Sequence, residues 1–345
     1  PGARLLIIRL RSLGDALLLT PALRALKQWR PDLRLSVLMY SRFAPILEGN
    51  PDIEELLTLD PEGPAAPLAI ARALDDVRRP RFAVCINLHG GTLSALLARA
   101  SGAPHRLAFG HFRFPSVYTA RAPDVRRFFG RERVHSVEWQ MGLFYWAGLP
   151  PAEIPPLRVF PQQAAKASVT RKLAAHGLEP GQPYAVVHPI SRIPTQDWPA
   201  ERYAALGRVL EEAGLTPVFH CGPGEEAKLD AIERAASGPV RQMRGLSIPE
   251  LVALIEGAAL FVGVDSGPAH IAAALGRPAV VLFGSMDSNI WRPWKAPHEI
   301  VQNYYACNPC KGDRCYAFAQ PECILSISVE QVRAAVKRLA ARELP

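Results

Sequence analysis

The segment FVGVDSGPAHIAAALG (261–276) combines an apolar run, a short polar turn and the start of a helix. The apolar residues up to Val264 predict a buried strand, and the glycine–proline pair at 267–268 predicts the turn that opens the helix. Such a junction directs unpaired backbone N–H groups and the positive end of a helix dipole toward one point, which suits a phosphate. A βα turn capped by Ser or Asp is the alternative interpretation. The residues expected to bind an anion here are Asp265, Ser266, Gly267, Pro268 and His270.

A similar junction near the start of the chain carries a carboxylate. The sequence RLLIIRLRSLGDALLLTPALRAL (4–26) predicts a strand, a loop at 12–15 and a helix whose apolar residues recur at i, i+3, i+4 and i+7. The glycine triplet of a dinucleotide-binding loop is absent. Asp15 is expected at the carboxyl end of the first strand, where ligands bind in open α/β sheets. It is a candidate general base, and capping of its own helix is the competing interpretation.

Three further loops follow predicted strands in the second half of the chain. In HPISRIPTQDWPAERYAAL (188–206) a Trp-Pro pair anchors a polar loop by burial and opens a helix. HCGPGEEAKL (220–229) has two acidic residues in the first turn of a helix, where they either bind sugar or ribose hydroxyls or simply complement the helix dipole. RGLSIPEL (244–251) predicts a capped helix preceded by a leucine that can lie against a flat base. The candidate ligands in these loops are Ser191, Arg192, Gln196, Glu225 and Leu246.

Seven arginines stand between residues 106 and 133, with two acidic and six aromatic residues (Phe and Tyr) among them. Nucleic-acid binding is one interpretation of a basic, aromatic segment, and a solvated loop is another. Because no recognised nucleic-acid module accompanies the segment, we expect an anionic small molecule or a lipid headgroup as its partner, and no nucleic acid. The candidate ligands for that partner are Arg113, Arg126 and Arg127.

The elements that must position these residues alternate along the whole chain. Strands are expected at 4–9, 34–39, 55–59, 81–88, 105–109, 184–188, 216–220, 259–264 and 279–283. Helices are expected near 15–29, 68–78, 92–100, 136–147, 200–213, 225–236, 248–256, 268–275 and 328–342. This βα rhythm predicts an α/β protein with parallel sheets covered by helices on both faces. The proline-rich stretch at 147–161 predicts a linker between domains 1–160 and 161–345, whose strand ends we expect to face one cleft.

Composition excludes several classes of protein. The 345 residues are 49% hydrophobic and 21% charged, which is typical of a globular protein, and no apolar run is long enough to span a membrane. The net charge of +8 calls for an anionic partner or surface. Six cysteines are too few for a disulfide-rich secreted scaffold, and the first strand begins almost at once, so a cytoplasmic location is expected.

Four of these cysteines form the array CNPCKGDRCYAFAQPEC (307–323). The spacing C-x2-C-x4-C-x7-C in a cytoplasmic protein suggests a structural zinc knuckle more than disulfides. Free thiols are the third interpretation, and no catalytic role is expected for the array. The remaining two cysteines fall in predicted strands and are expected to be buried.

Taken in order along the chain, several of these motifs resemble glycosyltransferase family 9, the ADP-heptose:lipopolysaccharide heptosyltransferases. The resemblance is carried by LGDALLLTPAL, by the loop that ends in Trp-Pro at 198–199 and by DSGPAH (265–270) followed by RPAVVLFG. It implies the GT-B fold, with an N-terminal acceptor domain and a C-terminal nucleotide-sugar domain. It also implies inverting, metal-independent transfer of heptose, or a related sugar, from a nucleotide sugar such as ADP-heptose to a lipopolysaccharide inner-core acceptor. No cofactor is expected, and the basic segment at 106–133 predicts peripheral contact with the cytoplasmic face of the inner membrane.

The resemblance also assigns roles to residues. Asp15 corresponds to the catalytic base, the 265–270 motif to the donor diphosphate site, and the three loops described above to donor ligands. One position departs from the family pattern, because a lysine is usual two residues before the Trp-Pro pair and this chain has Gln196. A lysine there would neutralise the leaving diphosphate, and the guanidinium of Arg192 is a candidate substitute. The alternative interpretation is that the donor or the activity differs from that of the family.

Two other functions are compatible with the same sequence features. A sugar-nucleotide epimerase of the same architecture would act on the donor without any acceptor. A two-lobed binding protein would use Asp15 only as a ligand contact or a helix cap.

Overall fold

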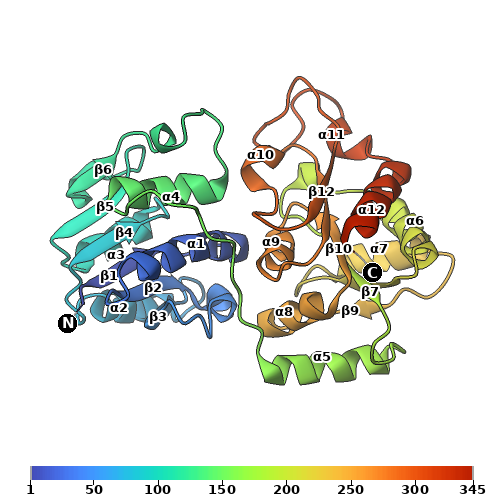
Figure 1. Ribbon diagram of the computed structural model, residues 1–345, viewed down its shortest axis with the longest axis horizontal. Coiled ribbons are helices and arrows are strands. Elements are labelled where there is room, and N and C mark those ends of the chain that lie inside the picture. Colours follow the sequence, from blue (N-terminus) through green and yellow to red (C-terminus); the bar gives the residue numbers. More distant parts are fainter. Residues whose placement is uncertain (1, 344–345) are drawn as a thin grey trace. The chain divides into compact units, whose positions relative to one another are not determined.

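The computed structural model describes residues 2–343 and divides into two compact units, unit 1 (residues 1–160) and unit 2 (residues 161–345) (Figure 1). Each unit contains a six-stranded, fully parallel sheet with helices on both faces. The predicted α/β class is thereby confirmed. Within the described residues, none of the helices combines the length and the apolar character needed to cross a lipid bilayer.

Unit 1 carries its sheet in the order β3-β2-β1-β4-β5-β6. The strands are β1 (Arg4–Ile8), β2 (Arg34–Tyr40), β3 (Glu55–Leu59), β4 (Val84–Asn87), β5 (His105–Phe109) and β6 (Ala120–Ala122). The helices are α1 (Leu13–Trp29), α2 (Ala66–Asp76), α3 (Thr92–Ala100) and α4 (Ser136–Trp146), with short 3-10 helices η1 (Ser41–Ile46), η2 (Pro115–Val117) and η3 (Arg126–Phe128). Because the order reverses at β1, the loops after β1 and β4 diverge and leave a crevice at the carboxyl edge.

Unit 2 repeats this topology with the order β12-β11-β10-β7-β8-β9. The strands are β7 (Tyr184–His188), β8 (Thr216–His220), β9 (Gln242–Met243), β10 (Leu260–Val264), β11 (Ala279–Phe283) and β12 (His298–Gln302). The helices are α5 (Gln163–Ala175), α6 (Ala200–Glu212), α7 (Glu226–Ala235), α8 (Ile248–Gly257), α9 (Gly267–Ala274), α10 (Ser288–Trp291), α11 (Glu322–Leu325) and α12 (Val329–Glu343), with the 3-10 helix η4 (Pro194–Gln196). Here the order reverses at β7, so the crevice lies between the loops that follow β7 and β10.

The central strands are apolar throughout because both faces of each sheet are covered. In unit 1, Leu6, Ile8 and Cys85 belong to a buried cluster with residues of α2 and α3. In unit 2, Val187, Val262 and Leu282 belong to a buried cluster with residues of α6, α7 and α12. Both sheets are thereby fixed rigidly enough to hold their carboxyl-edge loops in place.

The sequence pattern misses some elements at the edges. Strands β6, β9 and β12 lie at the ends of the two sheet orders or are very short, so their sequences lack a long apolar run. Helices α5, α10 and α11 are also missing from the prediction, and two of them have only four residues. The stretch between α4 and α5 contains no helix or strand, although Ile154 and Leu157 in it are buried.

Candidate active site

The predicted donor residues of unit 2 all follow the carboxyl ends of neighbouring strands. The register pairs His188 of β7 with Gly263 of β10, and His220 of β8 with Met243 of β9. The loops after these four strands therefore share one edge of the sheet. They carry Ser191, Arg192, Gln196, Glu225, Leu246 and the 265–270 motif.

Asp265 and Gln196 meet at the crevice of unit 2. The Gln196 amide is fully buried, and its Nε2 lies 3.4 Å from Oδ2 of Asp265, while its Oε1 lies 3.4 Å from the backbone nitrogen of Gly284. Gly284 permits this packing because a Cβ at that position would lie 2.4 Å from the carbonyl oxygen of Thr195. Burial raises the pKa of Asp265 to about 7, and the amide of Gln196 only partly opposes that effect. Gln196 therefore contacts a carboxyl group below the crevice rather than reaching into open space.

Helix α9 begins directly after Asp265 and presents its N-terminus at the same edge. Ser266 is the N-cap, and its buried hydroxyl has no hydrogen-bond partner in the described structure. Gly267 and Pro268 occupy the first two helical positions. His270 is only 4% exposed, so it lies within the helix packing rather than on open surface. An unpaired hydroxyl beside free N–H groups is the arrangement that an anion would complete.

A hollow of about 250 Å³ adjoins the loops after β7 and β8. Its lining residues are Pro189, Ile190, Ser191, Asp197, Glu225 and Lys228. Glu225 is the N-cap of α7, and its Oε2 accepts the N–H of Gly222 at 2.8 Å. Arg192, which follows Ser191 in the chain, is exposed, whereas Leu246 is buried.

Lys228 is a charged group in this hollow that the sequence analysis missed. The sequence spacing could have identified it, because Lys228 follows the candidate ligand Glu225 by three residues and therefore lies on the same face of α7. Arg9 in unit 1 was missed in the same way, since the pattern marks it only as the end of a strand.

Asp15 lies at the crevice of unit 1, where it makes both a helix cap and an ion pair. It is the third residue of α1, and its Oδ2 accepts the N–H of Ser12 at 3.0 Å and the hydroxyl of Ser12 at 3.2 Å. The guanidinium of Arg9 bonds to Oδ1 of Asp15 and also to the carbonyl oxygen of Leu88 after β4. The cap and the ion pair hold the carboxylate in one orientation, with 21% of its side chain exposed.

His89 follows β4 at the same edge and is electrostatically coupled to Asp15. Burial, together with the charges of Arg9 and Arg11, lowers the pKa of His89 to about 4 against the opposing effect of Asp15. The imidazole is therefore neutral at pH 7 and can accept or donate a single hydrogen bond. The edge thus contains a fixed carboxylate, a guanidinium and a neutral imidazole.

In the arginine-rich segment, Arg113 follows β5, and Arg126 and Arg127 follow β6, on the same carboxyl edge as Asp15. Arg126 is held by Asp124, with Nε 3.0 Å from Oδ1 and Nη2 2.9 Å from Oδ2. Arg113 and Arg127 are exposed and stack on Phe114 and Phe128, respectively, and no acidic partner is found for either among the described residues. Of the three predicted acceptor ligands, these two are the ones whose charge is uncompensated.

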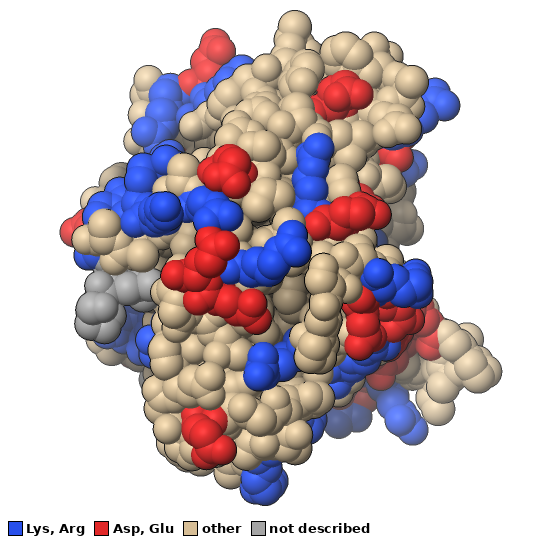
Figure 2. Space-filling model, turned by 90° about the vertical axis from the view of Figure 1, so that its right-hand side faces the viewer, with Lys and Arg blue, Asp and Glu red and all other residues tan. Residues whose placement is uncertain are grey.

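Charge is unequally divided between the units. Unit 1 contains 21 Lys and Arg against 14 Asp and Glu, whereas unit 2 contains 19 against 18. In Figure 2, basic and acidic groups are interspersed on the face that the view shows. Unit 2 also contains ion pairs of Arg338 and Arg342 with Glu299. The excess positive charge of the chain therefore belongs to the unit that carries Asp15.

The four clustered cysteines line one small cavity of about 30 Å³ as free thiols. Burial raises the pKa of the Cys323 thiol to about 11. Within residues 2–343 no group of three or more His, Cys, Asp or Glu side chains is arranged to hold a metal ion, so the zinc interpretation gains no support. Cys85 and Cys221 are buried, as predicted.

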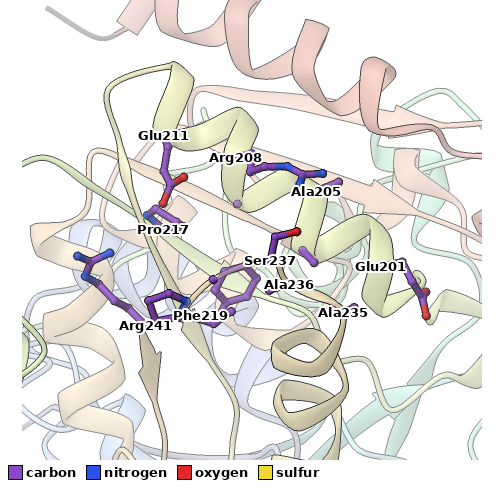
Figure 3. Close-up of a pocket in the computed structure, with 15 residues that line it drawn as sticks. Glu201, Ala205, Arg208, Glu211, Pro217, Phe219, Ala235, Ala236, Ser237 and Arg241 are labelled. Atoms are coloured by element: carbon purple, nitrogen blue, oxygen red, sulfur yellow. The ribbon is translucent and has the colours of Figure 1, made fainter.

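Unit 2 contains a further cavity of about 260 Å³, apart from the predicted site residues (Figure 3). It is enclosed by α6, by β8 residues including Phe219, and by the segment 235–241. The segment 235–241 leads out of α7 toward the start of β9, at the opposite edge from the hollow beside Glu225. None of the predicted site residues lines this cavity.

Comparison with known proteins places the chain in a family. Residues 70–318 match the sequence model of glycosyltransferase family 9 (heptosyltransferase). The chain is 30% identical over 342 residues to lipopolysaccharide heptosyltransferase 3 of Escherichia coli (strain K12), with 96% of each protein covered.

Two solved structures share the fold. A family 9 glycosyl transferase from Veillonella parvula superposes with a TM-score of 0.85 at 22% identity, covering 98% of this chain and 97% of that one. The ADP-heptose lps heptosyltransferase II of E. coli superposes with a TM-score of 0.82 at 19% identity, covering 99% and 100%. Both confirm two Rossmann-like domains of the GT-B class. The family match argues against the epimerase and binding-protein alternatives, and the chain belongs to glycosyltransferase family 9.

Proposed function

We propose that this enzyme transfers heptose from ADP-heptose to a sugar of the lipopolysaccharide inner core, with inversion at the anomeric carbon and without a metal ion. The names of its relatives support the substrates, since the 30% identical protein is a lipopolysaccharide heptosyltransferase and a fold neighbour is named for ADP-heptose. Unit 2 binds the donor and unit 1 the acceptor. The observation that carries the assignment is that Asp15 and the start of α9 each follow a strand at the point where strand order reverses.

On the donor side, the diphosphate binds at the N-terminus of α9. The unpartnered hydroxyl of Ser266 and the N–H groups of the first turn donate to its oxygens, and the exposed guanidinium of Arg192 adds a charge. Glu225 accepts hydrogen bonds from the ribose, and Leu246 lies beside the base. Pro268 fixes the start of the helix, and Gly267 allows close approach. His270 and Asp265 support this loop from below.

On the acceptor side, Asp15 takes the proton from the attacking hydroxyl. A single carboxylate is sufficient for an inverting displacement, because the nucleophile is the acceptor itself and no covalent enzyme intermediate forms. General-base catalysis of this kind contributes about 10²- to 10⁴-fold in rate. The leaving negative charge is stabilised by fixed groups of unit 2, in the manner of an oxyanion hole.

The acceptor is anionic and lipid-linked. The excess of basic over acidic residues in unit 1 and the two uncompensated arginines, Arg113 and Arg127, suit phosphate or carboxylate groups on the core saccharide. Arg126 contributes less, because Asp124 already occupies its guanidinium. The same cationic surface provides peripheral contact with anionic lipid at the cytoplasmic face of the inner membrane.

Acceptor-dependent release of ADP tests the proposal. The purified protein is incubated with ADP-heptose alone and with ADP-heptose plus a heptose-deficient core lipid, and ADP and the glycosylated lipid are both measured. The proposal requires ADP release that depends on the acceptor and matches the lipid product. Donor conversion without acceptor would indicate an epimerase or hydrolase instead, and the absence of any conversion would overturn the assignment of substrates.

A further inference from the structure

Lys228 occupies an unfavourable place for a cation. It is the third residue of α7, in the first turn, where the positive end of the helix dipole disfavours a positive charge. Only 17% of its side chain is exposed. A lysine held in this position needs a source of negative charge nearby.

The contacts of Lys228 only partly meet that need. Its Nζ lies 2.5 Å from Oδ1 of Asp197 and 2.7 Å from the carbonyl oxygen of Trp198, and it lies 5.7 Å from the centre of the Tyr203 ring. An ammonium group has three donors, so one N–H remains for another acceptor. The Asp197 carboxylate is 60% exposed and water competes for it, which weakens the pair.

The hollow beside Lys228 contains Glu225, which the proposed function assigns to the ribose, and Ser191, which the sequence predicts as a donor ligand. Both line it together with Lys228 and Asp197. Without the ammonium group the hollow would hold two carboxylates and would repel a phosphate. With it, the side chains provide a hydroxyl, a ribose acceptor and a cation within one space of about 250 Å³.

We infer that Lys228 binds a phosphate oxygen of the nucleoside diphosphate and supplies the positive charge that Gln196 does not provide. This inference rests on the proposed function, because it requires that unit 2 binds a nucleotide. The Trp198 carbonyl and Asp197 hold the ammonium group beside the hollow, and the phosphate oxygen accepts its remaining N–H. Lys228 and Arg192 together then supply the positive charge that a lysine at position 196 would provide.

The test compares two variants that break the same ion pair from opposite ends. Lys228→Met removes the cation and keeps the length of the side chain, and Asp197→Asn removes the anion and leaves the cation. Calorimetric titration with ADP is expected to show a dissociation constant raised about 10- to 100-fold in Lys228→Met, the loss typical of one charged hydrogen bond. In Asp197→Asn the released ammonium group should bind ADP as tightly as the wild type or more tightly.

Thermal unfolding and kinetics separate this role from a structural one. If Lys228 merely anchors the loop, both variants lose the same ion pair, and both should weaken ADP binding and lower Tm together; that result would overturn the inference. In turnover assays Lys228→Met should raise the KM for the donor and leave the KM for the acceptor unchanged. Wild-type protein that binds no ADP would refute the proposed function itself, whereas wild-type binding retained in Lys228→Met would refute only the role of Lys228.

Discussion

Replacement of Asp15 by Asn isolates the chemical role of this carboxylate from its structural ones. The Asn side chain can still accept the N–H of Ser12, because it retains an oxygen of similar position. It cannot take a proton from an acceptor hydroxyl. Loss of a general base is expected to lower kcat by about 10²- to 10⁴-fold, which is equivalent to about 3–5 kcal/mol of activation free energy.

The structural cost of this substitution follows from the ion pair with Arg9. Both side chains are partly buried, with 15% and 21% exposed, and Arg9 keeps its bond to the carbonyl of Leu88. Loss of one charge-assisted hydrogen bond of this kind costs about 1–3 kcal/mol in the free energy of unfolding. For a domain of this size that corresponds to a decrease of several degrees in Tm, so the variant should remain folded at about 25 °C.

Asp52→Asn is the matched control. Asp52 is another ion-paired carboxylate of unit 1, only 3% exposed, with Oδ1 3.3 Å from Arg24 and Oδ2 3.1 Å from Arg158. Because Asp52 makes two such bonds at a more buried site, Asp52→Asn should lose at least as much stability as Asp15→Asn and keep its turnover. ADP release is measured with saturating donor and acceptor, and ADP affinity by calorimetry. Turnover of Asp15→Asn close to that of wild type, or an equal loss of turnover in Asp52→Asn, would refute the general-base assignment.

Variants at an arginine, a buried carboxyl group and a buried tryptophan test other contacts. Arg127→Ala should raise the KM for the acceptor more than Arg126→Ala does, because Asp124 already neutralises Arg126. Neither variant should change the KM for the donor. A change confined to the donor KM would contradict the assignment of these arginines to the acceptor. Burial raises the pKa of Asp265 from 3.8 to about 7, so between these pH values the group binds more protons in the folded than in the unfolded state. Its contribution therefore makes the free energy of unfolding fall as pH rises from about 4 to 7. In urea titrations Asp265→Asn should flatten that part of the pH profile, and an unchanged slope would contradict this role of Asp265. Trp198→Phe should lower the free energy of unfolding by about 1–3 kcal/mol, because it removes the hydrogen bond of 2.9 Å that the buried indole N–H donates to the Ile327 carbonyl. Equal Tm values for the variant and the wild type would show that this hydrogen bond contributes little.

The sequence predicts the framework of both units because parallel, doubly covered strands need continuous apolar residues, and LLII and FVGV contain little else. The same pattern cannot predict β9 or β6, since two or three residues carry no periodicity. Strand order does not follow from the apolar pattern, yet it decides which loops lie next to Asp15 on the carboxyl edge. For this reason the candidate ligands could be named from their loops, while their contacts could not.

Side-chain partners are the part of the site that local sequence leaves open. Arg126 is adjacent to an equivalent arginine in the chain, and only the structure distinguishes them, through the pairing of one with Asp124. The helical pattern of the sequence predicts an exposed side chain for Lys228. In the structure this side chain is mostly buried against the loop at 197–198. In both cases the missing information is which charges are already neutralised.

The presence of Gln196 in place of a lysine can be understood from the charge balance of a buried pair. Burying one unpaired ion is costly, so a lysine at this position would require Asp265 to be ionised beside it. With a neutral amide at 196, burial favours the protonated carboxyl of Asp265 and raises its pKa to about 7, which lessens that cost. The arrangement with Gln196, however, offers no cation to a departing diphosphate.

A cation must then come from a neighbouring element. Lys228 lines the hollow together with Ser191 and Glu225, and Arg192 follows Ser191 in the chain. The substitution Gln196→Lys should therefore lower the pKa of Asp265 and make Lys228→Met less harmful to ADP binding. Calorimetric titration with ADP of both single variants, the double variant and the wild type measures this coupling. If Lys228→Met costs the same affinity in the wild-type and Gln196→Lys backgrounds, the two positions do not share this task.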